Sequence, residues 1–549
     1  MSVKALLLCS LSLLTACGSR LPSPPDRPFH PDDRPIEKPR SRDPRLVQEI
    51  IDKGMDYQLK QALDLPRTVR KLTGHPYQAL DVDPFDEAPN SSWFTNRNGR
   101  RPLSLEEIHR GPNRETGPDT TGPWQVISLK SAGVTPGMTI VDPRGHRYIL
   151  KFDPPDFPEL ASGAELVASR LFHAAGYNVP ENYIAHLPPS RLTVAPEARI
   201  KIATLDKRQP LQERPMTRED LEQVLRRANP AGRERIRVLA SRFLPGTPVG
   251  PWSYTGTRTD DANDIYPHEH RRSVRGLYVI ASWINHADMK EENTLDMYDP
   301  ERRRLTHYLI DFGASLGSNS TNPSNPRRGR ANSLDIKDSL LRLFTLGLYV
   351  HDYERAPRII HFPSVGYLGN DLFRADGWKP MYPVPAFENL TLRDAFWSAR
   401  IVTSFSDAQI ETAVAAGQFS NPDAAADLVR FLRERRDRLG RYWFARVNPL
   451  DRFEPRSAEL RFADLAILHG YADASRTRYQ YAVHSPQDEL LAEGTSSRTI
   501  LSLEPSWNRF DYVVVSLLPQ RPNLDAKPIL VYLRPCEESW TTIGLRRFD

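Results

Sequence analysis

The chain has 549 residues, of which 39% are hydrophobic, so it is long enough for two or three domains with their own cores. Its formal net charge is only +5, and no basic stripe with interleaved aromatic residues occurs, which argues against a nucleic-acid partner. The three cysteines, Cys9, Cys17 and Cys536, are too few for a disulfide framework or a multi-cysteine zinc site.

Residues 1–17 predict a signal peptide. Lys4 precedes an apolar run that is too short for a helix spanning a bilayer, and the run ends in Leu14-Thr-Ala-Cys17. This ending resembles the lipobox of bacterial lipoproteins, whose cleavage leaves the cysteine as a lipid-carrying N-terminus. The resemblance implies a membrane anchor at Cys17 and a location in the bacterial cell envelope, with Gly18 favouring the outer membrane. The alternative is an ordinary secretory signal with an incidental cysteine.

The segment that follows is expected to have little structure of its own. Proline and charged residues dominate residues 18–43, which predicts a disordered, extended tether. An N-terminal arm is predicted over 44–123. Within it, helical spacing of apolar residues predicts one helix over 44–72. The stretch 81–122 is rich in proline, glycine and asparagine, which predicts irregular chain packed by aromatic residues such as Trp93.

A change of pattern at Trp124 predicts a small sheet with a packed helix over residues 124–250. A glycine-containing turn over 131–137 joins its first two strands. The predicted strands are 124–130, 138–141, 146–152, 200–205 and 237–244. The predicted helices are 161–175, which ends at Gly176, and a polar helix over 217–228.

The remainder of the chain divides into a helical region and a β region. Residues 251–455 are predicted to be mainly helical, with helices over 269–285, 338–349, 391–405, 407–417 and 422–446. Residues 456–549 predict a small β-sandwich, because short alternating runs are separated by turn residues. Its predicted strands are 479–483, 490–492, 499–503, 512–518 and 529–533.

Two short motifs carry the functional information. The string His286-Ala-Asp-Met-Lys-Glu-Glu-Asn293 fits H-x-D-x-K-x-x-N, the pattern of a protein kinase catalytic loop. Asp311-Phe-Gly313 follows a hydrophobic run a short way downstream and fits the kinase metal-binding D-F-G. On these motifs the stretch from Trp124 to Trp443 resembles the protein kinase-like superfamily, as an atypical bacterial member. The resemblance implies an α+β, two-lobed fold, with 124–250 as its small lobe and 251–455 as its helical large lobe.

The resemblance also implies a nucleotide site between the lobes. Lys151, on a predicted strand, would contact the phosphates of ATP or another nucleoside triphosphate. Glu165, on the next helix, would pair with this lysine and fix its position. Gly133 and Gly137 would form the turn that covers the phosphates.

The catalytic roles fall on the two motifs. Asp288 would orient the acceptor hydroxyl or act as the base, and Lys290 would neutralise charge on the transferred phosphoryl group. Asn293 and Asp311 would ligate Mg²⁺, which prefers hard oxygen ligands. His286 is expected to brace the loop rather than to react.

Three departures from the pattern limit what the resemblance implies. No G-x-G-x-x-G occurs, and Gly133 and Gly137 are a looser substitute. Ala287 stands where many kinases have the arginine that senses a phosphorylated activation loop, so no such switch is expected. No A-P-E triplet follows Asp311-Phe-Gly313. The acceptor substrate is therefore open and is not assumed to be a protein.

Three hypotheses follow from the sequence. The first is a membrane-anchored, Mg-nucleotide-dependent phosphotransferase with an unknown hydroxyl acceptor. The second is a catalytically silent kinase-fold lipoprotein that acts as a binding scaffold in the cell envelope, where ATP is scarce. The third is an envelope lipoprotein whose likeness to kinases is accidental. The first two hypotheses require that five residues converge in one cleft, and the third hypothesis does not. These residues are Lys151, Glu165, Asp288, Asn293 and Asp311.

Overall fold

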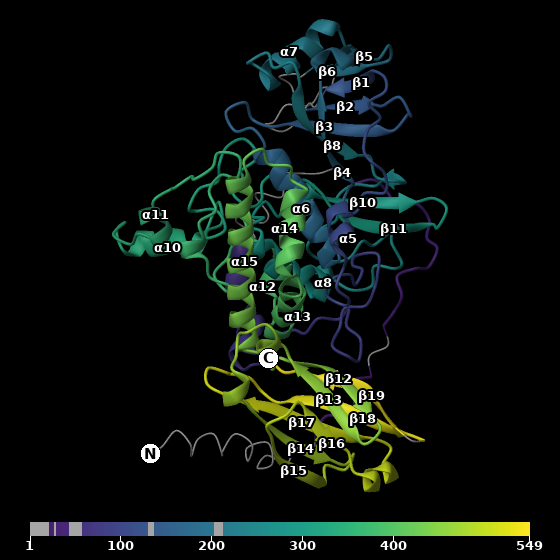
Figure 1. The fold of residues 1–549 in the computed structure, drawn as a ribbon, viewed down its shortest axis with the longest axis vertical. Helices are drawn as coiled ribbons and strands as arrows, with labels where there is room; N and C mark the ends of the chain where they lie inside the picture. The colour runs from purple at the N-terminus through teal and green to yellow at the C-terminus, as the bar shows by residue number, and fades with distance from the viewer. Residues whose placement is uncertain (1–20, 27–28, 43–56, 130–136, 203–211, 538) are drawn as a thin grey trace. The chain divides into compact units, whose positions relative to one another are not determined.

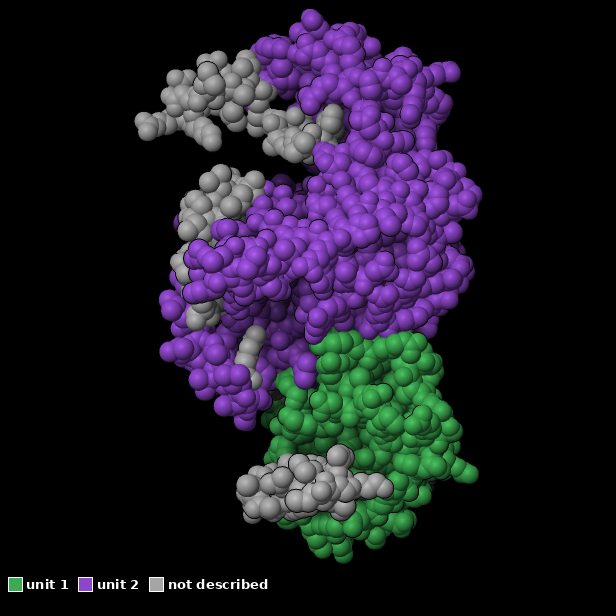
Figure 2. Space-filling view, turned by 90° about the vertical axis from the view of Figure 1, so that its left-hand side faces the viewer, with its two compact units in different colours: residues 1–29, 82–88, 441–549 green, residues 30–81, 89–440 purple. Residues whose placement is uncertain are grey.

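The computed structural model describes residues 21–26, 29–42, 57–129, 137–202, 212–537 and 539–549. These residues form an α+β structure with several separate sheets. The chain divides into two compact units, which Figure 2 colours differently. One unit comprises 30–81 and 89–440, and the other comprises 1–29, 82–88 and 441–549. Within the described residues, no helix is long and apolar enough to cross a membrane.

The region 124–250 contains a six-stranded sheet in the order β4-β8-β3-β2-β1-β5 (Figure 1). Neighbouring strands are antiparallel except β1 and β5, which are parallel. The strands are β1 (Trp124–Leu129), β2 (Gly137–Val141), β3 (Arg147–Phe152), β4 (Asn182–Leu187), β5 (Leu192–Val194) and β8 (Ile236–Arg242). A separate hairpin pairs β6 (Arg199–Ile202) with β7 (Gln212–Pro215).

The two faces of this sheet have different partners. Strand residues such as Leu150 and Val238 pack in one core with Leu221 and Leu225 of helix α7 (Arg218–Ala228). Because side chains alternate along a strand, Lys151 and Leu239 lie on the opposite face. On that face Leu239 packs against Leu166 of α6 (Leu160–Ala175). The sheet therefore presents Lys151 toward α6.

The region after β8 is mainly helical, as the sequence predicts. Its helices are α8 (Arg272–Arg275), α9 (Leu277–Trp283), α10 (Ile336–Phe344), α11 (Asp352–Arg355), α12 (Pro385–Glu388), α13 (Leu392–Thr403), α14 (Asp407–Ala415) and α15 (Pro422–Phe444). A small antiparallel sheet, in the order β11-β10-β9, contains β9 (Thr247–Pro248), β10 (Thr294–Asp299) and β11 (Arg304–Leu309). This hairpin of β10 and β11 was absent from the sequence prediction.

The single helix predicted over 269–285 is wrong. The chain forms a short 3₁₀ turn over His268–His270 and then the two helices α8 and α9, which meet at Gly276. A Cβ at Gly276 would lie 2.5 Å from a ring carbon of Trp397 on α13, so the glycine permits close packing at this junction. The apolar residues do recur at helical spacing, but this periodicity does not reveal a break between two consecutive helices.

The N-terminal arm is packed by its aromatic residues, as predicted. Trp93 stacks on His307 with ring centroids 3.7 Å apart, and Phe94 lies 5.1 Å from the ring of Trp397. The described part of the predicted 44–72 helix forms α3 (Tyr57–Leu63) and α4 (Leu65–Leu72). One further helix, α5 (Leu105–Arg110), was missed, although Ser104 and Glu107 form a capping box at its start.

The tether predicted over 18–43 is not free of contacts in its described part. Ile36 is buried with Val249, Tyr298 and Leu305, and its N–H donates to the carbonyl of Arg303 at 2.7 Å. The segment has no helix or strand over 29–42, which agrees with the predicted extended chain. A composition rich in proline predicts the absence of regular structure, but it does not exclude an extended segment that is docked by a buried side chain and by hydrogen bonds to distant residues.

The C-terminal unit contains two antiparallel sheets around one core, which is the predicted β-sandwich architecture. One sheet has the order β12-β13-β16 and the other β15-β14-β17-β18-β19. The strands are β12 (Leu450–Arg456), β13 (Glu459–Asp464), β14 (Arg478–His484), β15 (Leu490–Ser496), β16 (Ile500–Ser502), β17 (Val513–Gln520), β18 (Ile529–Cys536) and β19 (Ser539–Arg546). Short helix α16 (Leu465–Leu468) follows β13.

The boundary predicted at residue 456 differs from the one in the structure. The C-terminal unit begins at Arg441, because Leu450 of β12 already belongs to the sandwich core. The unit also includes chain from the N-terminal side: the hydroxyl of Tyr532 donates to the carbonyl of Pro22 at 2.7 Å. No pattern in the sequence around either residue predicts such a contact between distant parts of the chain.

Candidate active site

Lys151 is the central group of the site. Strand β3 holds it between Gly137 of β2 and Leu239 of β8, its direct cross-strand partners. Its Nζ donates to Oε2 of Glu165 at 3.0 Å and to Oδ1 of Asp311 at 3.0 Å. Three of the predicted site residues therefore form one charged cluster, although Lys151 and Asp311 are 160 positions apart in the sequence.

Helix α6 delivers Glu165 into this cluster. The carboxylate of Asp153, just after β3, accepts hydrogen bonds from the first-turn N–H groups of Ala161 and Ser162 at 3.0 and 2.8 Å. These bonds satisfy donors that a helix start leaves unpaired, and they fasten α6 to the end of the lysine strand. Asp153 is thus a structural residue that fixes the start of α6.

The electrostatics of the cluster favour a charged lysine. Burial alone disfavours the ammonium, but the carboxylates of Asp311 and Glu165 outweigh this and raise the pKa of Lys151 above its ordinary value. Burial raises the pKa of Glu165, against the opposing effect of Lys151, and the charge of Asp311 adds to the rise. Two carboxylates share one ammonium, so the cluster with both acids ionised has a net negative charge and suits a cation.

The β10–β11 hairpin brings the two motifs together. Thr294 and Leu309 are cross-strand partners, and the N–H of Ile310 donates to the carbonyl of Asn293 at 3.0 Å. Asn293 immediately precedes β10, and Asp311 follows Ile310, so the hairpin sets both at the same end. Asp311 has φ of +63°, a conformation that is uncommon for a residue other than glycine and is concentrated at functional sites.

The catalytic-loop residues also contact one another. The amide Nδ2 of Asn293 donates to the carbonyl of Asp288 at 2.8 Å and to its Oδ2 at 3.1 Å. Nζ of Lys290 lies 3.5 Å from the same Oδ2. Burial opposes the charge of Lys290, but Asp288, Glu292 and Asp311 together raise its pKa. The influence of Asp311 on Lys290 links this group to the cluster around Lys151.

Magnesium fits the donor set of these residues. Because Nδ2 of Asn293 is used in hydrogen bonds to Asp288, its amide oxygen is the atom suited to a metal, and Asp311 contributes a carboxylate that is 46% exposed. No group of three or more His, Cys, Asp or Glu residues suited to a metal occurs within the described residues. Mg²⁺ needs no such cage, since it is commonly bound by one or two protein oxygens together with phosphates and water.

An aromatic group connects the site's elements. Phe312 lies 5.0 Å from Phe172 of α6 and 5.6 Å from His286, measured between ring centroids. Burial lowers the pKa of His286 to about 4, although Asp288 and Asp311 act in the opposite direction. A neutral imidazole packed on two phenylalanines is a brace, which agrees with the role expected for His286.

This buried histidine predicts a pH dependence of stability. The unfolded chain binds a proton at His286 near its ordinary pKa, whereas the folded chain binds it only near 4. The contribution of His286 to the free energy of unfolding is therefore constant above the ordinary pKa of histidine. It falls as the pH drops through that value. Between pH 7 and pH 5 the expected loss from this group is about 2 kcal/mol. Urea unfolding at both pH values measures it. His286→Asn should have a smaller loss than wild type, and an equal loss contradicts the prediction.

The predicted phosphate-covering turn is only partly described. Gly133 lies outside the described residues, while Gly137 starts β2 directly beside Lys151. A small cavity of about 20 Å³ is lined by Lys151, Phe152, Ala161, Ser162, Glu165, Leu239, Asp311, Gly313 and Ser320. On the same sheet face as Lys151, Ile149 is 38% exposed, and Phe243 after β8 is 45% exposed. These apolar surfaces are suited to the base of a nucleotide.

One site residue was missed from the sequence. Arg328, in the long loop after Gly313, is largely buried, which lowers its pKa, while the charge of Asp288 acts in the opposite direction. Its Nη2 donates to the carbonyl of Ala314 at 3.3 Å. No local pattern in this polar loop singles out one of its several arginines, so only the tertiary structure identifies it. Cys17 lies outside the described residues.

Comparisons with known proteins give little further information. No protein-family model matches the sequence, and no curated protein is significantly similar to it. The chain is similar to the solved structure of the Helicobacter pylori proinflammatory kinase CtkA, with 13% identity and a TM-score of 0.30, over 58% of this chain and 99% of that one. It is similar to the Golgi casein kinase with 10% identity and a TM-score of 0.24, over 76% and 96%. At these TM-scores neither likeness establishes a shared fold.

Proposed function

We propose that the chain is a kinase-like phosphotransferase that moves a phosphoryl group from a Mg²⁺-bound nucleoside triphosphate to a hydroxyl acceptor. The single observation that carries this proposal is the contact of Lys151 with both Glu165 and Asp311 at 3.0 Å. A lysine held by a helix glutamate, next to the aspartate of D-F-G, is the arrangement that the sequence resemblance requires. The order β1, β2, β3, α6 and β4 also follows the order expected for a kinase small lobe, and β8 comes after β5, β6, β7 and α7.

The residues of the site have distinct roles in this proposal. Lys151 holds the phosphates, and Glu165 keeps its ammonium in place. The amide oxygen of Asn293 and the carboxylate of Asp311 hold Mg²⁺, which when bound with the nucleotide neutralises charge on the transferred group. Asp288 orients the acceptor hydroxyl and accepts its proton. Lys290, 3.5 Å from Asp288, stabilises negative charge that develops beside it.

The location belongs to the proposal as well. A lipid on Cys17 would anchor the chain to the bacterial outer membrane, with the site in the cell envelope. The acceptor and the natural phosphate donor in that compartment are both open. A catalytically silent scaffold of the same fold is the competing outcome of the test below.

Nucleotide binding gives the direct test. In a thermal-shift titration, ATP with Mg²⁺ should raise the melting temperature of the full chain, with a stabilisation of about 2.7 kcal/mol at 100 times the dissociation constant. Asp311→Ala should remove the part of the shift that depends on Mg²⁺, because the metal loses its carboxylate ligand. Glu222→Gln, on the outer helix α7, is the matched control and should keep the full shift. Absence of any shift with ATP, GTP or other nucleotides would refute the enzymatic proposal.

A further inference from the structure

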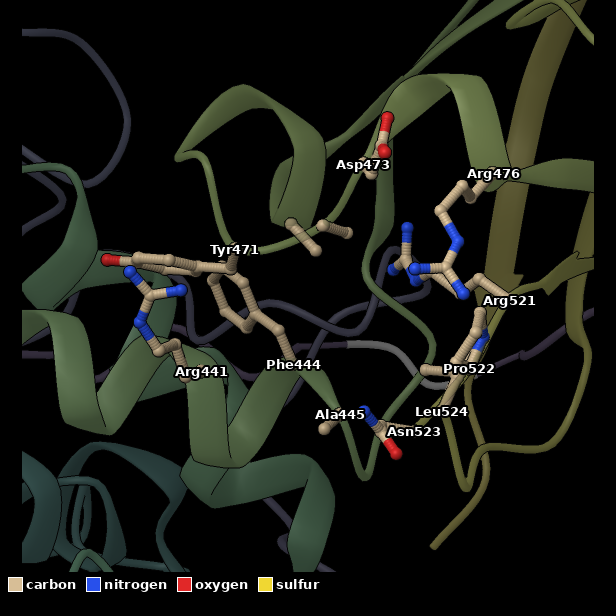
Figure 3. Close-up of a pocket in the computed structure, with 12 residues that line it drawn as sticks. Arg441, Phe444, Ala445, Tyr471, Asp473, Arg476, Arg521, Pro522, Asn523 and Leu524 are labelled. Atoms are coloured by element: carbon tan, nitrogen blue, oxygen red, sulfur yellow. The ribbon is translucent and has the colours of Figure 1, made fainter.

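A second pocket belongs to the C-terminal unit, and none of its lining residues has a role in the proposed function. It has a volume of about 390 Å³, within the range of small-molecule sites. Figure 3 shows its lining, which comes from the end of α15, the α16–β14 connection and the loop after β17. The lining residues are Arg441, Phe444, Ala445, Ala466, Tyr471, Ala472, Asp473, Arg476, Arg521, Pro522, Asn523 and Leu524.

The first sign of a ligand is an incompletely satisfied arginine. The side chain of Arg521 is only 6% exposed, and its Nη1 donates to Oδ2 of Asp464 at 2.6 Å. Its Nη2 is buried and has no hydrogen-bond partner in the structure. A buried donor on a charged group that remains unpaired destabilises the folded chain. Arg521 also lines the pocket, where an anionic ligand would add a partner for its guanidinium.

Asp464 cannot supply the missing partner, because its oxygens are already used. Oδ1 accepts from the N–H of Ala466 at 3.1 Å, where it caps α16, and Oδ2 also accepts from the hydroxyl of Tyr479 at 3.3 Å. This aspartate is almost fully buried. It therefore fixes the position of the Arg521 guanidinium through Nη1, at the wall of the pocket that Arg521 lines.

Two further arginines, Arg441 and Arg476, line the pocket. Arg476 and Arg521 extend into the same part of the pocket, and Arg441 lies over the ring of Tyr471 at 4.9 Å (Figure 3). Asp473 is the one acidic residue among the lining residues, and its Oδ1 accepts from the N–H and hydroxyl of Ser475 at 2.8 and 2.7 Å. Because Asp464 pairs with Arg521, the three arginines and these two aspartates leave an excess of one positive charge, which suits an anion such as a phosphate monoester.

The remaining lining surface is apolar. Phe444, Pro522 and Leu524 lie beside the arginines, and Tyr471 adds an aromatic ring. Guanidinium groups bind phosphate oxygens through paired N–H donors, while apolar walls gain from covering a nonpolar body. We propose that this pocket binds a small phosphate monoester whose phosphate contacts Arg476 and Arg521 and whose nonpolar or aromatic body lies against Phe444 and Leu524.

Isothermal titration calorimetry on the full chain tests this proposal with phenyl phosphate, inorganic phosphate and benzoate, in low salt without Mg²⁺. Phenyl phosphate should bind at one site per chain, and more tightly than either fragment. Arg476→Gln should weaken it about tenfold or more, since a charge-assisted contact is lost. Arg476 is exposed, so its replacement should leave the fold intact, unlike replacement of Arg521.

Two controls separate this site from the proposed nucleotide site. Arg498→Gln, exposed in the same unit but outside the pocket, should bind phenyl phosphate like wild type. Lys151→Met should lose nucleotide binding and keep phenyl phosphate binding. No saturable binding of phenyl phosphate, or equal binding by wild type and Arg476→Gln, overturns the proposal. If benzoate binds as tightly as phenyl phosphate, the preference for phosphate is overturned. If Lys151→Met loses phenyl phosphate binding, the binding belongs to the proposed nucleotide site and the proposal is overturned.

Discussion

Asp288→Asn is expected to lower the rate of phosphoryl transfer from Mg-ATP about 100- to 10,000-fold, the usual contribution of a positioned general base. The substitution keeps the shape of the side chain. It removes the carboxylate that accepts from Nδ2 of Asn293 at 3.1 Å and lies 3.5 Å from Nζ of Lys290. Nucleotide binding should be unchanged, because Lys151, Glu165 and Asp311 remain. Release of inorganic phosphate and transfer of labelled phosphate measure the rate, with water or the chain itself as acceptor.

The design distinguishes a catalyst from a scaffold. Glu301→Gln, in the turn of the same β10–β11 hairpin, is the control and should transfer phosphate at the wild-type rate. A wild-type protein that binds Mg-nucleotide and transfers no phosphate would support the scaffold hypothesis. Equal, measurable rates in wild type and Asp288→Asn would leave the kinase-like fold standing and remove Asp288 from the mechanism.

Asp394→Ala is expected to destabilise the unit that holds the site by about 3–5 kcal/mol. Asp394, in the first turn of α13, is fully buried, and its two oxygens lie 3.0 Å from Nε of Arg272 and 3.0 Å from Nη1 of Arg275. Both arginines are also buried, so removing the carboxylate leaves two cations in the interior. Burial raises the pKa of Asp394, but the two arginines outweigh it and lower the pKa. Its stabilisation is therefore present near neutral pH and is lost only as the pH falls.

A matched control separates burial from charge pairing. Asp407 lies in the first turn of α14 and also contacts two arginines, Arg436 at 2.7 Å and Arg433 at 3.4 Å, but its side chain is 54% exposed. Asp407→Ala should cost no more than about 1 kcal/mol, because solvent screens exposed ion pairs. Chemical unfolding followed by tryptophan fluorescence compares the two variants. Similar losses in both would contradict the prediction.

Local patterns predicted the elements that carry the site with good accuracy. The helix predicted over 161–175 is α6, and the strands predicted over 138–141 and 146–152 are β2 and β3. These succeed because apolar alternation and helical spacing depend on residues close in sequence. The same patterns failed at 269–285, where Gly276 separates two short helices, and missed the β10–β11 hairpin that aligns Asn293 with Asp311.

The supporting groups around the site were not predictable. Arg328, Phe172 and Asp394 come from elements distant in sequence from the residues they support, and none belongs to a motif. The same holds for Ile36, which docks a proline-rich segment expected to be free. Their positions depend on which surfaces meet in the folded chain, and periodicity within one element contains no information about its partner.

The sequence by itself determined which residues are candidates for the site, because the resemblance to kinase motifs selects residue types that phosphoryl transfer requires. These candidates are Lys151, Glu165, Asp288, Asn293 and Asp311. Only the tertiary structure decided that Lys151 contacts both Glu165 and Asp311, since hydrogen bonds across 14 and 160 positions form only when β3, α6 and β11 pack together. The tertiary structure also revealed that Nη2 of Arg521 is buried without a hydrogen-bond partner. Whether a side-chain donor is shielded from water depends on how the chain packs around it, and the residue type alone does not determine it.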